Sequence, residues 1–125
     1  MPVNDAFIHL GCRAVFLRSI EAGRFVHIRD AVGDGLERLI QRDRIYVRAS
    51  ARRYRRGDYQ GDHVMIITFT PRHRALLEDT RAELRALTDS KCTYFDAIVL
   101  ALLESVEATE ICEPAALPDI VEKKS

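Results

Sequence analysis

The chain has 125 residues, a formal net charge of zero, 47% hydrophobic residues and 30% charged residues. This length predicts one domain with a core large enough to fold without disulfides or metals, and the composition excludes disordered and collagen-like chains. No apolar run approaches the ~18 residues that a membrane span needs, which excludes a transmembrane protein. Three widely spaced cysteines and the lack of a signal-peptide pattern predict a cytoplasmic protein with reduced thiols.

The first half of the sequence predicts an N-terminal α/β extension. Helical spacing predicts an opening helix, based on four apolar residues: Phe7, Leu10, Ala14 and Leu17. Residues 24–28 then predict a short strand, and Asp30 is positioned to cap a helix over 31–42. The β-branched and aromatic content of residues 45–47 predicts a second strand.

The zero net charge hides an uneven distribution along the chain. Residues 1–74 carry 14 basic and 8 acidic side chains, a net charge of +6, whereas residues 75–125 carry 5 and 11, a net charge of −6. Seven arginines lie between Arg42 and Arg56, opposed only by Asp43. This asymmetry favours a nucleic-acid contact in the first half, although an arginine-rich face can also be solvated or paired within the fold.

A polar segment without periodicity separates the two halves. Residues 51–62 contain two glycines and four arginines, which predicts a loop or arm between units. The predicted organisation is an N-terminal extension over 1–50, a basic linker over 51–62, a domain over 63–111 and a flexible tail over 112–125.

The second half begins with a strand predicted over 64–69. Thr70 is a favoured N-cap and Pro71 suits the first position of a helix, because its missing N–H would be unpaired there. Apolar residues at helical spacing extend this helix over 71–87, and a second helix is predicted over 91–109.

The second of these helices carries an unusual demand for burial. Residues 97–103 are apolar on every side of the helix. A helix that is apolar all round must be buried all round, and one strand and one neighbouring helix cannot cover it. We therefore expect either the N-terminal half or a second copy of the chain to surround this helix.

Strand, capped helix, short turn and apolar helix together resemble the ribbon-helix-helix family of DNA-binding proteins (the Arc, MetJ and CopG type). The resemblance covers about residues 64–108 and depends on Ile-Ile-Thr-Phe-Thr-Pro over 66–71 and Asp-Ser-Lys-Cys-Thr-Tyr-Phe over 89–95. It implies that two chains pair their strands into a ribbon that enters the DNA major groove. The fold class expected is α+β and mostly helical, with an intertwined ribbon-helix-helix dimer and an N-terminal α/β extension.

The resemblance also implies a homodimer bound to double-stranded DNA, and family members often regulate plasmids and other mobile elements. It implies DNA contacts by three ribbon side chains and two backbone N–H groups: Val64, Ile66, Thr68, Ser90 and Lys91. It implies a dimer core of five apolar residues: Phe69, Phe95, Ile98, Val99 and Leu102.

Arginines before the ribbon form a second candidate DNA contact. These are Arg48, Arg52, Arg53, Arg55 and Arg56. Arginine pairs bidentately with phosphate and with the guanine edge, so this segment is suited to touching DNA; a merely solubilising loop is the alternative. The predicted function is a dimeric, sequence-specific transcriptional regulator that inserts the two-stranded ribbon and the arginine-rich arm into DNA grooves. The resemblance suggests a plasmid or mobile element as its setting, with a role in conjugation, partition or copy control.

No pattern in the sequence indicates catalysis, a metal site or a cofactor. The four histidines are scattered without metal-ligand spacing, and no phosphate-cradling glycine loop is present. Two other functions stay open: a protein-interaction or oligomerisation module without specific DNA binding, and an RNA-binding protein. Steep salt dependence is expected of DNA binding but not of an apolar dimer.

Overall fold

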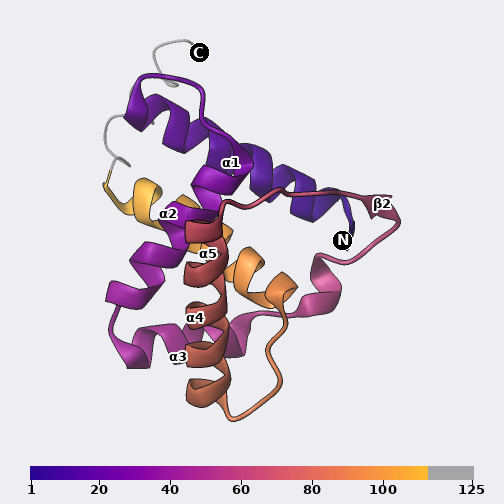
Figure 1. Ribbon diagram of the computed structural model, residues 1–125, viewed down its shortest axis with the longest axis vertical. Coiled ribbons are helices and arrows are strands. Elements are labelled where there is room, and N and C mark those ends of the chain that lie inside the picture. Colours follow the sequence, from indigo (N-terminus) through magenta and orange to yellow (C-terminus); the bar gives the residue numbers. More distant parts are fainter. Residues whose placement is uncertain (113–125) are drawn as a thin grey trace, which may run out of the picture.

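A computed structural model describes residues 1–112 of the chain, with side chains described as far as Glu107. Within this range the protein is mostly helical, with a two-stranded sheet at one edge (Figure 1). The elements in chain order are β1 (Pro2–Val3), α1 (Asp5–Ala22), α2 (Ile28–Gln41), α3 (Arg44–Arg53), the 3-10 helix η1 (Arg56–Asp58), β2 (His63–Val64), α4 (Pro71–Thr88) and α5 (Tyr94–Cys112).

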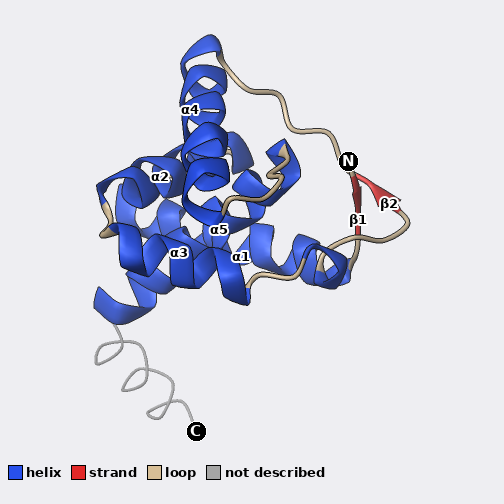
Figure 2. Cartoon of the chain, turned by 90° about the horizontal axis from the view of Figure 1, so that it is seen from below, coloured by secondary structure: helices blue, strands red, loops and turns tan. Residues whose placement is uncertain are grey.

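Helix α5 is the centre of the fold. It contacts α1, α2 and α4, and Figure 2 shows it between the other helices. Ile98, Val99 and Leu102 are almost completely buried by the same chain. The need to cover this apolar helix is therefore met by the N-terminal half together with α4, without a second copy.

The expected intertwined ribbon-helix-helix dimer is wrong. Of the predicted strand over 64–69, only Val64 is in a strand, because β2 is His63–Val64, and β2 pairs antiparallel with Pro2–Val3 of the same chain. The Met1 amino group donates to the Met65 carbonyl oxygen at 3.0 Å, and the Met65 N–H donates to the Met1 carbonyl oxygen at 3.0 Å. The N-terminus thus occupies one edge of this segment, and the predicted dimer core is the core of one chain.

The expected N-terminal α/β extension is also wrong, because both predicted strands fail. Residues 45–47 lie in α3, where Asp43 caps the helix by accepting from the Ile45 N–H at 2.7 Å. Residues 24–27 form the link after Gly23, whose positive φ of 72° ends α1, and α2 begins at Ile28. The β-branched side chains of these segments face solvent or a helix neighbour rather than a strand.

The predicted helices with strong local signals are confirmed. The four spaced apolar residues of α1 are all buried. Thr70 caps α4 by accepting from the His73 N–H at 3.2 Å, and Pro71 is its first residue. Apolar spacing identifies α1, and the cap with Pro71 identifies the start of α4, so local sequence sufficed for both helices.

A glycine brings α2 against the central helix. A Cβ at Gly35 would lie 1.9 Å from the Ala101 carbonyl oxygen of α5. Because only a residue without Cβ permits this approach, Gly35 sets the distance between the two most extensively packed helices.

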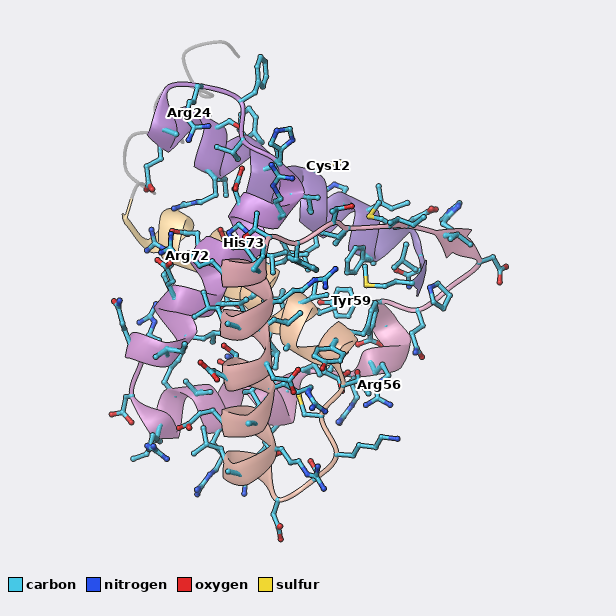
Figure 3. The ribbon with its side chains drawn as sticks, viewed as in Figure 1. Cys12, Arg24, Arg56, Tyr59, Arg72 and His73 are labelled. Atoms are coloured by element: carbon cyan, nitrogen blue, oxygen red, sulfur yellow. The ribbon has the colours of Figure 1, made fainter. Side chains whose placement is uncertain are left out.

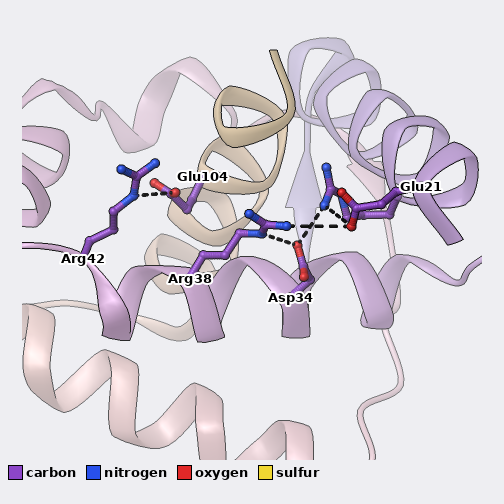
Figure 4. Close-up of polar contacts among 6 residues, drawn as sticks. Glu21, Asp34, Arg38, Arg42 and Glu104 are labelled. Atoms are coloured by element: carbon purple, nitrogen blue, oxygen red, sulfur yellow. Dashed lines mark hydrogen bonds and ion pairs between the residues drawn. The ribbon is translucent and has the colours of Figure 1, made fainter. Parts of the chain in front are cut away.

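Ion pairs join α1, α2 and α5 (Figure 4). Asp34 accepts from Arg38 at 2.8 Å and from the buried Arg18 at 3.4 Å. Arg42 donates to Glu104, a carboxylate on α5 that is only 2% exposed, at 2.9 Å. Pairing offsets the cost of placing these charges inside the fold.

Among the described residues, none of the helices combines the length and apolarity that a bilayer crossing requires. The predicted tail begins at Cys112, the last residue of α5. Beyond it, the tail lies outside the described residues.

Candidate nucleic-acid interface

Helix α3 presents the arginines of the first half to solvent. Val47 anchors its inner side in the core, and α3 packs against α4. Arg44 at its start donates to Glu83 of α4 at 2.9 Å. Because this side of α3 is fixed against the protein, the residues on the opposite side of the helix, which recur every three or four positions, face outward.

Four exposed arginines of α3 and the following turn form what we call the arginine surface: Arg48, Arg52, Arg53 and Arg55. Arg53 donates weakly to the Ser50 hydroxyl oxygen, at 3.4 Å. In the described part of the chain, none of the four has a carboxylate partner within ion-pair distance. The surface is therefore a group of cations whose charge is not neutralised by these described neighbours.

Two apolar residues lie beside the arginines on the outer side of α3. Ile45 is 78% exposed and Ala49 is also exposed, four residues later. Apolar side chains of this kind contact thymine methyl groups when a helix enters the major groove. The outer face of α3 thus combines cations with small apolar contacts.

Arg56 forms an ion pair within the chain and is therefore not counted in the arginine surface (Figure 3). It donates to both carboxylate oxygens of Asp96, at 2.8 and 2.6 Å, and the Tyr54 hydroxyl donates to the same group at 2.7 Å. Burial alone would raise the pKa of Asp96, but hydrogen bonds from Arg56 and its other donors outweigh burial and lower the pKa to about 2. Arg56 therefore attaches η1 to the start of α5.

Ser90 and Lys91 lie outside the helix that they were expected to begin. Thr93 and Asp96 cap α5 reciprocally: Asp96 accepts from the Thr93 N–H at 3.0 Å, and its own N–H donates to the Thr93 hydroxyl at 3.2 Å. Helix α5 consequently starts at Tyr94. The predicted phosphate contact by N–H groups at a helix start does not apply to Ser90 and Lys91.

The loop that contains these two residues nevertheless borders the arginine-bearing segment. Ser90 and Lys91 line a cavity of about 220 Å³ together with Ala51 of α3. They also line a larger groove of about 510 Å³ with Arg85 of α4. The cavity with Ala51 therefore places Lys91 next to α3, whereas Arg85 lies in the second groove, which no residue of α3 lines.

The expected ribbon side chains lie elsewhere. Val64, Ile66 and Thr68 are exposed, whereas the residues between them are half-buried, as strict alternation predicts. Ile66 borders α1 rather than α3, and Figure 1 shows β2 far from α3. The fold thus separates an apolar exposed segment from the basic area.

Of the five residues of the predicted dimer core, three are buried and two are half-buried within one chain. Ile98, Val99 and Leu102 are buried in α5. Phe95 is half-buried and stacks on Phe7 of α1, with ring centroids 5.6 Å apart. Phe69 is half-buried and meets the His73 ring edge-on.

Ile45 and Ala49 belong to this area but were missed from the sequence. The signal was available for α3: Asp43 is an N-cap type, and Val47 and Tyr54 are seven residues apart, or two helical turns.

Two observations concern the groups that could bind a metal or act as a nucleophile in the described residues. No group of three His, Cys, Asp or Glu side chains is arranged to hold a metal ion there. Burial raises the pKa of the Cys92 thiol to about 11, so this cysteine is a packed side chain with little thiolate.

Comparison of the sequence with protein-family models, with curated proteins and with solved structures found no match.

Proposed function

We propose that this protein binds double-stranded DNA with the outer face of α3. The observation that carries the proposal is the arginine surface, four exposed cations without a carboxylate partner among the described residues. Lys91 lines a cavity with Ala51 of α3 and adds a positive charge beside the same segment. Arginine is the side chain best suited to phosphate and to the guanine edge.

The shape of α3 supports a groove contact in addition to phosphate contacts. A helix with its side chains is about 10–12 Å across, and the major groove is about 12 Å wide and admits a helix. The ten residues of α3 provide about 15 Å of helix along the groove. Arg48 and Arg52 form one row of the outer face, and Ala49 lies between this row and Arg53. In the proposed complex the arginines hold the backbone while Ile45 and Ala49 contact base edges, which provides the sequence preference of a regulator.

The test begins with selection of duplexes from a random DNA library by the full chain, followed by titration of a selected duplex at several salt concentrations. Each phosphate contact contributes about 0.9 to the slope of log affinity against log salt. Replacement of two of the four arginines in one variant, Arg48→Gln with Arg52→Gln, should therefore reduce the slope by about two. It should weaken selected and scrambled duplexes alike.

Arg72→Gln is the control for an exposed arginine away from the arginine surface. Arg72 is 80% exposed and donates to Glu37 of α2 at 2.8 Å. It lies at the start of α4, sixteen residues or about 24 Å of helix from Thr88, after which the loop with Lys91 follows. This variant should leave the slope unchanged. An equal loss in both variants, or no salt-sensitive retention of any duplex, contradicts the proposal. Stronger competition by single-stranded RNA than by duplex DNA would assign the surface to RNA.

A further inference from the structure

An apolar groove lies along α1, away from the arginine surface. Its volume is about 790 Å³, and its walls are α1, the link and first residue of α2 over 23–28, and Met65–Ile66. We call it the α1 groove. Its lining on α1 runs from Phe7 to Ile20, thirteen residues or about 20 Å of helix. Its length and open apolar floor are those of a binding surface rather than of a packing defect.

The floor and one wall are fixed by contacts within the chain. The Val26 N–H donates to the Ser19 hydroxyl at 3.0 Å, which ties the link to α1. Gly11 is buried, and a Cβ there would lie 3.0 Å from the Ile28 Cδ1 atom. Because Ile28 sits directly on the bare backbone of α1, the groove keeps its form before any partner arrives, which lowers the entropy lost on binding.

Large apolar side chains stand at the edges of the α1 groove rather than at its bottom. Phe25 is 94% exposed, Ile66 is 85% exposed, and Phe16 and Ile20 are more than half exposed. A small molecule seated in the groove would leave Phe25 and Ile66 in water. A partner that covers them must extend beyond the cavity, which favours a protein segment.

The shape of this surface is concave. A flat bilayer surface would contact the edges and leave the floor empty, whereas a helix about 10 Å across fills a groove between two walls. The α1 lining is long enough for an apolar stripe of three to four turns. These dimensions favour a helix over a membrane.

The charge of the groove lining indicates which kind of helix would bind there. Among the fourteen lining residues Arg24 is the one with a full charge, and no carboxylate lines the groove. In the described part of the chain the Arg24 guanidinium donates only to the Phe25 carbonyl oxygen, at 3.5 Å, and it lies at the link end of the groove (Figure 3). In a two-fold dimer this surface would face itself, with no acid to meet Arg24. A partner with acidic residues complements it.

We propose that the α1 groove binds an amphipathic helix of another protein, with an apolar stripe against α1 and acidic residues facing Arg24. The apolar stripe buries the exposed edges, and the acidic residues fix the direction of the helix. This function is separate from DNA binding, since the two surfaces share no residue.

The probe is a pair of fluorescent 16-residue helical peptides with leucine at i, i+4, i+7 and i+11. The two peptides differ only in the residues beside the stripe, glutamate in one and lysine in the other. Anisotropy titration with the full chain should show saturable binding of the glutamate peptide, about tenfold or more tighter than of the lysine peptide. Arg24→Glu should reverse this preference.

Two isoleucines of nearly equal exposure provide a matched pair of variants. Ile20, in the groove, is 53% exposed, and Ile40, at the end of α2, is 50% exposed. Ile20→Ser should weaken the glutamate peptide by about fivefold or more, because apolar contact is lost, whereas Ile40→Ser should not change it. Both side chains are half exposed, so circular dichroism should show folded protein for each.

Four results would overturn the proposal. They are no saturable binding of the glutamate peptide, equal binding of the lysine peptide, an equal effect of Ile40→Ser, and no effect of Ile20→Ser. Self-association that Ile20→Ser abolishes would assign the groove to a second copy. Co-sedimentation with phosphatidylglycerol vesicles that the same variant abolishes would assign it to a membrane.

Discussion

Asp96 shows how one carboxylate can join three parts of the chain. It is 4% exposed, caps α5 through Thr93, and accepts from Arg56 of η1 and from Tyr54 after α3. A buried charge with this many donors is stabilised in its ionised form. The same hydrogen bonds hold the segment after the arginine surface against the core.

Asp96→Asn should lower the free energy of unfolding at pH 7 by about 2 kcal/mol, the value of a pKa lowered from 3.8 to about 2. Since the folded pKa is the lower one, this stability is present above about pH 4 and is lost as pH falls towards 2. Urea unfolding of both proteins from pH 7 to pH 2 measures the difference, which should shrink across that window.

Asp62→Asn, an exposed aspartate, is the control for this titration and should differ little from wild type at either pH. A deficit of Asp96→Asn that stays constant down to pH 2 would contradict the role given to the ionised carboxylate. It would instead indicate a loss of packing alone.

At the scale of the element, α2 depends on close approach to α5. Glycine lowers helix propensity, and Gly33 and Gly35 together would weaken α2 as an isolated helix. In the folded chain Gly35 lies against the α5 backbone and Gly33 lies under the His73 ring. Tertiary packing therefore offsets a local weakness.

Gly35→Ala should destabilise the protein by about 3 kcal/mol, because its Cβ would meet backbone atoms that cannot rotate away. Gly57→Ala is the matched control, since a Cβ at Gly57 has no atom within 4 Å and its φ is not positive. Thermal or urea unfolding compares the two. Similar stability of both variants would show that α2 and α5 do not approach as closely as described.

Local sequence predicted those elements that carry a strong capping or periodicity signal. Thr70 and Pro71 place the start of α4, and the spaced apolar residues place α1. The prediction for α3 was wrong because Ile45, Tyr46 and Val47 look like a strand when only three residues are considered. The helical spacing of its buried residues becomes visible only over about ten residues. The β2 region failed because its partner is the N-terminus, some sixty residues away.

The candidate interface shows the same division between local and distant information. The cluster of arginines is visible in the sequence, but the separate role of Arg56 is not. Asp96 lies forty residues further along, and nothing near Arg56 indicates that pairing. Nor could the sequence show whether the same chain or a second copy surrounds α5, because the hydrophobic effect favours burial against any apolar surface.

For the whole molecule, a core built by one chain predicts stability that is independent of protein concentration. Urea unfolding at 1 and 100 µM, followed by circular dichroism, should give the same midpoint. If two chains shared the core, the hundredfold increase in concentration would stabilise it by about 3 kcal/mol. A midpoint that rises with concentration would contradict a core formed by one chain.

The central position of α5 also sets an order of events during synthesis. Helices α1, α2 and α4 leave the ribosome before the helix that they contact, and at roughly 5–20 residues per second the residues of α5 take about one to four seconds more. Until then α1, α2 and α4 lack the α5 side chains that complete the core around buried residues such as Leu17 and Leu36. The nascent chain thus exposes apolar surface for as long as α5 is missing, and completion of α5 is the step that covers it.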